Sequence, residues 1–315
     1  MTASGGADVA ESGEVFVLIA RLIADGSGQG TGDLETRLDA AANAFAAAQM
    51  PLASAVMLDI GAPVIELRFA EAERVGVLEV IDRFFAPTGV LVSGEEIVPP
   101  SLFVSDMDST MIGQECIDEL ADFAGLKEQI SQITERAMQG ELDFESALRE
   151  RVGLLAGLDE SAIERCLVER IAPTPGARTL VATLKAQGTR CVLVTGGFHH
   201  FGDRVADWLG FDRVVGNRLA VADGKLTGGL DGPISDASTK LAVLREEAAG
   251  QGAAARILAS GDGANDIPMI EAAHYGFAYR AKPKARAAAN GRVEGEDLTA
   301  ILSLLGIARK DWVEA

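Results

Sequence analysis

The chain has 315 residues, enough for two domains, and 48% of them are apolar, so a large core can form. Its 47 acidic and 28 basic residues give a formal net charge of −19, which repels nucleic acid and anionic lipid, so we expect neither as a partner. The amino terminus has no secretory pattern, no apolar run is long enough to span a membrane, and the three cysteines are scattered. These features predict a cytoplasmic protein with free thiols.

The first 98 residues have the pattern of a small α+β domain behind a polar tail, with the tail at 1–13 and the domain at 14–98. The expected elements are a strand at 15–24, a helix at 33–49, two strands within 54–69, a helix at 71–85 and a strand near 90–92. This β-α-β-β-α-β order is the split pattern of ferredoxin-like domains, and it resembles ACT-type regulatory domains in element order. Our hypothesis is that the domain binds an amino-acid effector such as serine, or mediates homodimerisation.

From residue 99 to 315, after two consecutive prolines, the pattern changes to strands that alternate with helices. Four strands are expected at 102–108, 190–197, 256–263 and 274–279. This alternation is typical of a Rossmann-like parallel sheet with helices on both faces, where ligands bind beyond the carboxyl ends of the strands. The long helical stretch after the first strand predicts an inserted helical cap at about 112–172, and a β-hairpin is expected within 218–228.

The first of these strands ends in Asp106-Met107-Asp108-Ser109-Thr110. At the end of a strand, two carboxylates spaced by one residue can bend apart, so that one faces a substrate and the other lies beside it. An EF-hand calcium loop is excluded, because Met111 stands where that loop needs glycine and Ile117 where it needs glutamate. A turn whose Asp and Ser cap the next helix stays an alternative for the motif on its own.

Two later strands also end in polar turns. Thr195-Gly196-Gly197 offers a hydroxyl and unhindered backbone N–H groups, which is a pattern for binding anions. The segment from Gly261 to Asp266 brings carboxylates that suit a hard cation such as Mg²⁺, and Lys240 lies near a helix start between the two turns. Each feature alone is equally typical of an ordinary turn or a solvated lysine. Together they supply a nucleophile, a hydroxyl, a lysine and a metal carboxylate in one order.

The order DxDx[ST], then [ST]GG, then Lys, then GDGxND resembles that of the haloacid dehalogenase superfamily. Within it, the segments DMDSTMIGQECIDELA, RAMQGELDFESALRERV, VTGGF, GKLTG and GDGANDIPM are similar to those of phosphoserine phosphatases. The resemblance covers roughly residues 102–305 and does not extend to the first 98. It implies a Mg²⁺-dependent enzyme that hydrolyses O-phospho-L-serine to L-serine and phosphate, the last step of serine biosynthesis.

The same resemblance implies roles for the residues at the strand ends. Asp106 would be the covalent nucleophile, and Asp108 the general acid and base. Magnesium would be held by the Asp106 and Asp262 carboxylates and the Asp108 backbone carbonyl, with Asp266 in the shell around it. The groups expected to bind the phosphoryl oxygens or contact the substrate are Thr195, the Gly196 N–H, Lys240 and Asn265.

In the cap, the resemblance implies that Glu115 holds the substrate ammonium group and Arg151 its carboxylate. Met138 and Phe144 would line the pocket and help to exclude water. The residues alone leave other interpretations open: Arg151 as a solvated helix arginine, and Met138 and Phe144 as core of the cap.

The sequence leaves two rival functions open. The same chemistry could serve another small phosphomonoester, or a transfer of the phosphoryl group to an acceptor alcohol. Glu115 and Arg151 favour phosphoserine, because substrates without an amino-acid end would not need both. A catalytically inert binding module is the lesser alternative, and the intact Asp106, Asp108, Lys240 and Asp262 argue against it.

Overall fold

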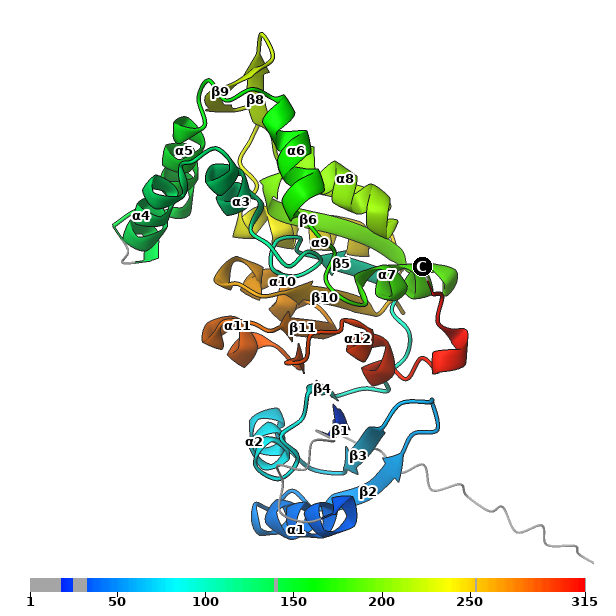
Figure 1. Cartoon of the computed structure of the whole chain (residues 1–315). Coiled ribbons are helices and arrows are strands. Elements are labelled where there is room, and N and C mark those ends of the chain that lie inside the picture. The colour runs from blue at the N-terminus through cyan, green and yellow to red at the C-terminus, as the bar shows by residue number, and fades with distance from the viewer. Residues whose placement is uncertain (1–17, 25–32, 139–140, 253, 315) are drawn as a thin grey trace, which may run out of the picture.

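A computed structural model of the protein is shown in Figure 1. It describes residues 18–24, 33–138, 141–252 and 254–314. The predicted tail at 1–13 and the first three residues of the strand expected at 15–24 lie outside the described residues. Among the described residues, every helix is too short or too polar to cross a membrane.

The front part of the chain has the predicted β-α-β-β-α-β order. Its elements are β1 (Leu18–Ile23), α1 (Leu34–Ala47), β2 (Leu52–Met57), β3 (Val64–Phe69), α2 (Arg74–Phe85) and β4 (Gly89–Ser93). The strands lie in the order β2-β3-β1-β4 and all neighbouring pairs are antiparallel. The ferredoxin-like prediction is therefore confirmed.

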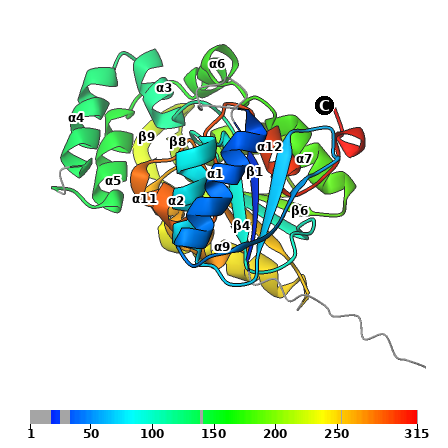
Figure 2. The ribbon, with the colours of Figure 1, turned by 90° about the horizontal axis from the view of Figure 1, so that it is seen from below.

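Local sequence explains why these elements pack as one layer of helices on one sheet. Asp33 caps α1 by accepting a hydrogen bond from the Thr36 amide at 2.9 Å. The buried face of α1 carries Phe45, whose ring meets that of Phe69 on β3 edge to face, with centroids 4.9 Å apart. Figure 2 shows α1 and α2 side by side over one face of the strands.

Residues 99–315, called the phosphatase-like part after the resemblance of their motifs, form the predicted parallel sheet, in the order β12-β11-β10-β5-β6-β7. Its elements are β5 (Leu102–Ser105), α7 (Ala177–Ala186), β6 (Arg190–Phe198), α8 (His199–Leu209), β7 (Arg213–Asn217), α9 (Ala237–Ala249), β10 (Ile257–Gly261), the 3₁₀ turn η1 (Ala264–Asp266), α10 (Ile267–Ala272), β11 (Tyr275–Tyr279), α11 (Pro283–Ala288), β12 (Gly291–Val293), α12 (Thr299–Leu304) and the 3₁₀ turn η2 (Arg309–Asp311). Strands β7 and β12 were not expected from the sequence.

The two parts share one ten-stranded sheet, because β4 pairs with β12 in antiparallel register. Asp82 on α2 reinforces this junction by pairing with Arg292 on β12 and with Arg286 at 3.6 Å. Arg21 on β1 donates to the Leu304 carbonyl at 3.1 Å from the other side. The domain boundary predicted at Pro99 therefore follows a strand that is built into the neighbouring sheet, and the exact division of the chain stays a prediction.

The segment between β5 and α7 holds four helices: α3 (Cys116–Phe123), α4 (Lys127–Met138), α5 (Phe144–Leu154) and α6 (Ser161–Arg170). Its entrance and exit lie together, since Ile112 and Pro173 form an isolated antiparallel bridge. The hairpin β8 (Leu219–Ala222) and β9 (Lys225–Leu230) joins it, because Gly157 N–H donates to the Leu226 carbonyl at 2.8 Å. Figure 1 shows these elements at the end of the molecule opposite the front part.

Candidate active site

Parallel pairing brings the predicted motifs to one edge of the sheet. Ser105, the last residue of β5, lies opposite Ser260 on β10, and their hydroxyls are 2.8 Å apart. The Asp106 amide then donates to the Ser260 carbonyl at 2.9 Å. Asp106 and Asp262 consequently leave adjacent strands at the same height, as the strand-end argument predicted.

A buried lysine lies between two of the carboxylates. Lys240 Nζ is 2.7 Å from Asp106 Oδ1 and 2.6 Å from Asp266 Oδ1, and its side chain is fully buried. Burial opposes its charge, but Asp106 and Asp266 outweigh this effect and raise the pKa of Lys240 above its ordinary value. Burial, reinforced by the Asp266 carboxylate, raises the pKa of Asp106 well above its ordinary value despite the lysine. The helical lysine is therefore not a solvated surface residue.

Three carboxylates at this edge form a group that suits a cation. Oxygens of Asp106, Asp262 and Asp266 all lie within 4.8 Å of one another. Asp266 is already engaged, because its Oδ2 accepts from the amides of Asp262 at 3.1 Å and Gly263 at 2.9 Å, and its Oδ1 meets Lys240. Burial raises the pKa of Asp262 to about 6. Asp106 and Asp262 thus keep oxygens that a hard divalent ion would neutralise, and Asp266 orients the loop.

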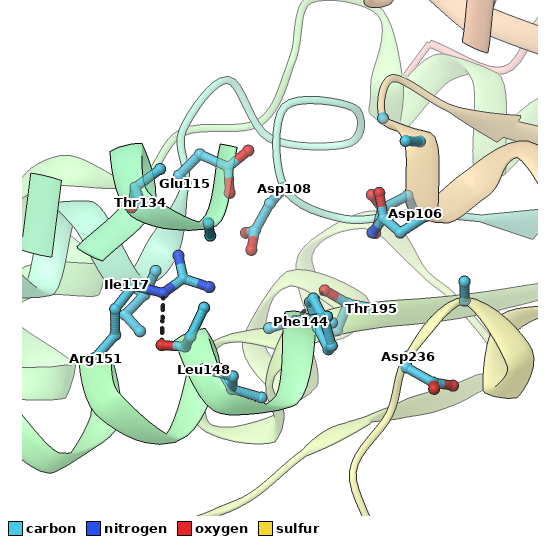
Figure 3. Close-up of a pocket in the computed structure, with 18 of the residues that line it drawn as sticks. Asp106, Asp108, Glu115, Ile117, Thr134, Phe144, Leu148, Arg151, Thr195 and Asp236 are labelled. Atoms are coloured by element: carbon cyan, nitrogen blue, oxygen red, sulfur yellow. Dashed lines mark hydrogen bonds between the residues drawn. The ribbon is translucent and has the colours of Figure 1, made fainter. Parts of the chain in front are cut away.

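The turn after Asp106 separates the two motif carboxylates, and Figure 3 shows Asp108 between Asp106 and Glu115. Asp108 accepts the Cys116 amide at 3.4 Å, and a side chain at Gly197 would bring its Cβ to 2.8 Å from Asp108 Oδ2. Only glycine leaves room for this carboxylate there. Burial and the nearby Glu115 raise the pKa of Asp108 to about 7, a value at which a carboxyl can both give and take a proton near neutral pH.

Residues 195–197 form a turn within β6. The hydroxyl of Thr195 accepts the Gly197 amide at 2.8 Å. Thr195 and Gly196 line a cavity of about 650 Å³, together with Asp106, Asp108, Asp262 and Asn265. The structure thus brings the strand-end residues into one cavity, while Lys240 and Asp266 lie buried behind its wall.

The cap closes the other side of this cavity with Glu115, Phe144 and Arg151. Glu115 accepts a hydrogen bond from the Ser109 hydroxyl at 2.9 Å. Arg151 Nε donates to the Ala147 carbonyl of its own helix at 3.3 Å, and its guanidinium makes no ion pair with any described residue. The Phe144 ring lies over the turn, since a Cβ at Gly196 would be 3.3 Å from it. Met138 ends α4, but its side chain lies outside the described residues.

Two further charged residues line the cavity and were not expected from the sequence. Lys282 Nζ is 4.0 Å from Asp262 Oδ2, and its amide donates to the Asp262 carbonyl at 3.0 Å. Asp236 caps α9 by accepting the Thr239 amide at 3.0 Å. Lys282 follows β11, the fourth predicted strand. Because ligands bind beyond the carboxyl ends of such strands, its place at the site could have been predicted. The D-A-S-T segment before Lys240 is a helix-start pattern that points to Asp236.

Comparison with known proteins gives one consistent family. The model of the haloacid dehalogenase-like hydrolases matches residues 103–271. Curated phosphoserine phosphatases from Archaeoglobus fulgidus and Streptomyces coelicolor are each 45% identical to the chain over 65% and 68% of it. The chain spans 59% and 52% of the length of these two relatives. It covers 95% of the phosphoserine phosphatase from Albidiferax ferrireducens, at 42% identity over 69% of this chain.

Solved structures agree with the sequence relatives. A phosphoserine phosphatase solved as a phospho-aspartyl intermediate analogue superposes with a TM-score of 0.59 and 38% identity, over 65% of this chain and 98% of that one. A probable phosphoserine phosphatase from Vibrio cholerae reaches 0.68 at 29% identity over 93% of this chain and 87% of its own. A family hydrolase from Salmonella enterica serovar Typhi reaches 0.75 at 27% identity over 91% and 97% of the two chains. The chain belongs to the haloacid dehalogenase-like hydrolase family.

Proposed function

We propose that this protein is a Mg²⁺-dependent phosphoserine phosphatase that acts in the cytoplasm, at the last step of serine biosynthesis. The observation that carries the proposal is one cavity with two chemically different ends. Asp106, beside the buried Lys240, lies at the phosphate end, while Glu115 and Arg151 lie at the end formed by the cap. The phosphoserine phosphatases among the relatives support the choice of substrate. The buried free cysteines Cys116, Cys166 and Cys191 suit a reducing compartment.

At the phosphate end, an Asp106 oxygen attacks phosphorus and the bond from phosphorus to the serine oxygen breaks. Asp108 gives its proton to the departing serine oxygen. A water then attacks the aspartyl-phosphate, Asp108 takes the proton of that water, and the bond from phosphorus to Asp106 breaks to release phosphate. Thr195 and the Gly196 N–H orient the phosphoryl oxygens, and Lys240, 2.7 Å from Asp106 behind the cavity wall, adds positive charge beside them.

The metal would be held by the Asp106 and Asp262 carboxylates and the Asp108 carbonyl. When bound, Mg²⁺ supplies positive charge that offsets the negative phosphate and the carboxylates around it. The oxygen-only donor set on adjacent strand ends supports this ion. Asp266 would serve by holding Lys240 and the 262–263 backbone in place.

At the amino-acid end, Glu115 would bind the ammonium group and Arg151 the carboxylate of the substrate. Arg151 suits this role because its guanidinium is half-buried, faces the cavity, and makes no ion pair with any residue in the described ranges. A planar guanidinium can bind a carboxylate with two parallel hydrogen bonds. Phe144 and Met138 would shield this end from water, and Asn265 would contact the substrate between the two ends.

The front part of the chain is proposed to bind an amino-acid effector or to mediate homodimerisation through residues 14–98. Removing this part would expose the edge of β12 and would leave Arg292 without its ion-pair partner Asp82. The test therefore uses the full chain. Mass photometry and steady-state kinetics of the full chain, with and without L-serine, should reveal a dimer or a serine effect beyond product inhibition. A monomer whose inhibition by serine is purely competitive would contradict both roles.

The experiment that tests the function is phosphate release from five phosphomonoesters, with Mg²⁺ and with a chelator. The panel is L-phosphoserine, phosphothreonine, phosphoethanolamine, glycerol phosphate and a sugar phosphate. We expect Mg²⁺-dependent release with a strong preference for phosphoserine. Activity spread evenly over the panel would keep the Asp106 chemistry and overturn the substrate. Absence of release from every compound would favour a phosphotransferase or an inert binding module.

A further inference from the structure

The turn that faces the phosphate end is a bulge in β6. The β6–β7 register passes from Val194 opposite Val215 to Phe198 opposite Asn217. Three residues, 195–197, therefore stand opposite the single residue Gly216. A side chain at Gly216 would place its Cβ 2.9 Å from Thr195 Cγ2, so glycine lets β7 approach the bulge. The ladder cannot supply regular partners for the carbonyls of these residues.

Two buried side chains bind those carbonyls instead. The Ser235 hydroxyl donates to the Thr195 carbonyl at 2.8 Å. The Asn217 amide nitrogen donates to the Gly196 carbonyl at 2.8 Å. Asn217 and Ser235 are 1% and 3% exposed, and neither lines the cavity, so they touch the back of the turn and not a ligand.

Asn217 also holds Ser235 itself. Its Oδ1 accepts the Ser235 amide at 2.8 Å, and its Nδ2 reaches the Ser235 carbonyl at 3.3 Å. Ser235 directly precedes Asp236, the cap of α9, and α9 carries Lys240. The same two side chains therefore join the phosphate turn to the start of the helix that supplies the lysine.

The direction of a carbonyl fixes the direction of the N–H in the same peptide unit. In a planar trans peptide, the C=O and the N–H point in opposite directions. The carbonyl of Thr195 and the amide of Gly196 belong to one such unit. A hydroxyl that holds the Thr195 carbonyl away from the cavity thus aims the Gly196 N–H toward it.

We infer that Asn217 and Ser235 are positioning residues for phosphate binding. Ser235 sets the aim of the Gly196 N–H, while Asn217 fixes the following peptide unit, between Gly196 and Gly197, and holds Ser235 in place. They act from behind the turn, without contact with the substrate. This inference rests on the proposed function for its substrate, but its content is binding of a phosphate group at this turn.

The test is binding of inorganic phosphate by the full-length protein with Mg²⁺, measured by isothermal titration calorimetry. Ser235→Ala removes only a buried hydroxyl, and we expect it to weaken phosphate binding about tenfold. Asn217→Asp keeps an acceptor for the Ser235 amide but loses the donor to Gly196, so a loss of similar or greater size is expected. Inhibition by L-serine, which would occupy the amino-acid end, should change less than about twofold in both variants.

A control is available in Asn290, which also donates to one carbonyl and accepts one amide, and which does not line the cavity. Its Nδ2 donates to the His274 carbonyl and its Oδ1 accepts the Gly276 amide, both at 2.7 Å. Asn290→Asp, the same change as in Asn217→Asp, should lower the melting temperature and leave phosphate affinity unchanged. Circular dichroism establishes that each variant is folded, and Ser235→Ala remains informative if an Asn217 variant is not.

Unchanged phosphate affinity in a folded Ser235→Ala variant would overturn the inference. Equal losses of phosphate and serine binding would overturn it too, because they indicate general damage to the site. Failure of the wild-type protein to bind phosphate would remove its basis. If the variants behave as expected but phosphoserine is not hydrolysed, the positioning role stands and the substrate assignment falls.

Discussion

The front part and the phosphatase-like part share one sheet, yet they differ in how far their buried carboxylates are balanced by positive charge. In the front part, Glu66 lies between two arginines, 2.8 Å from Arg21 Nε and 2.7 Å from Arg68 Nε. In the phosphatase-like part, one lysine serves two carboxylates, Asp106 and Asp266, and a third, Asp262, stands beside them. The first arrangement is balanced within the fold, while the second leaves negative charge in excess.

The carboxyl groups respond accordingly. Burial acts to raise the pKa of Glu66, but hydrogen bonds from Arg21 and Arg68 hold it below its ordinary value. Burial raises the pKa of Asp106 and Asp262 as well, and there the cationic partners do not compensate. Uncompensated negative charge favours the binding of a cation, which a site for phosphate chemistry needs. Compensated charge at Glu66 is therefore typical of a structural ion pair, and uncompensated charge at Asp106 and Asp262 is typical of a functional site.

The largest expected effect comes from Asp106→Asn. An amide cannot act as the nucleophile, so kcat should fall at least about a thousandfold. The melting temperature should not fall, because the change removes one of three crowded carboxylates. Steady-state kinetics and thermal unfolding measure both quantities.

Asp223→Asn is the matched control for Asp106→Asn. Asp223 lies at the exposed turn of the β8–β9 hairpin with φ of +51°, which asparagine tolerates. Its activity should equal that of the wild type. Substantial turnover by Asp106→Asn would contradict the covalent role.

The second expected effect tests the other side of the comparison. Glu66→Ala leaves the buried Arg21 without its carboxylate and should cost about 3–5 kcal/mol of unfolding free energy, measured by urea titration. The kcat of the folded variant should stay within about twofold of the wild type. Removing Glu164, which pairs with Arg204 at the exposed surface, should cost less than about 1 kcal/mol. A harmless Glu66→Ala would show that the front ion pair does not stabilise the fold.

Arg151→Ala sharpens the comparison within the cavity itself. Losing the guanidinium should lower kcat/KM for phosphoserine about a hundredfold, chiefly through KM, and leave hydrolysis of a generic aryl phosphate nearly unchanged. Arg149→Ala is the control, because Arg149 lies on the same helix and pairs with Glu145 in solvent. Equal losses on both substrates would mean that Arg151 supports the cap and does not select the substrate.

The last expected effect is a gain in stability from Asp108→Asn that depends on pH and leaves the chemistry aside. Burial raises the pKa of Asp108 to about 7 in the folded protein, whereas the unfolded carboxyl titrates near 3.8. The folded state is therefore penalised increasingly as pH rises from 3.8 to about 7, and by a constant amount above that.

The variant removes this penalty in metal-free buffer. Its melting temperature should match the wild type at about pH 4 and exceed it by about 6 °C at about pH 8. Thermal scans across this range check the trend. A gain that is constant with pH would show that Asp108 does not titrate in this way.

The ends of the central strands could be predicted from the sequence, because each of these strands is an apolar run followed by a polar turn. The strand that ends before Asp106 and the one that ends at Gly261 are such cases. Strand β12, only three residues long at Gly291–Val293, carries no such signal. Its pairing with β4, and hence the continuous sheet, depends on contacts between distant segments that no local pattern encodes.

The candidate site divides in the same way. Asp106, Thr195 and Asp262 face the cavity and belong to sequence motifs, so their place at the site could be predicted. Asn217 and Ser235 lie in unremarkable segments and act through the backbone of another strand, so only the register of β6 against β7 reveals them. Side chains that position other groups are generally less visible in a sequence than those that do chemistry.

The most direct test of the central claim is to trap the phosphorylated enzyme. The full-length protein would be mixed with phosphoserine and Mg²⁺, quenched in acid within the first turnover, digested, and examined by mass spectrometry. We expect one phosphoryl group on the peptide that contains Asp106, and none when Asp106→Asn is treated in the same way. Rapid turnover with no phosphorylated peptide, or a phosphoryl group on another residue, would contradict the claim.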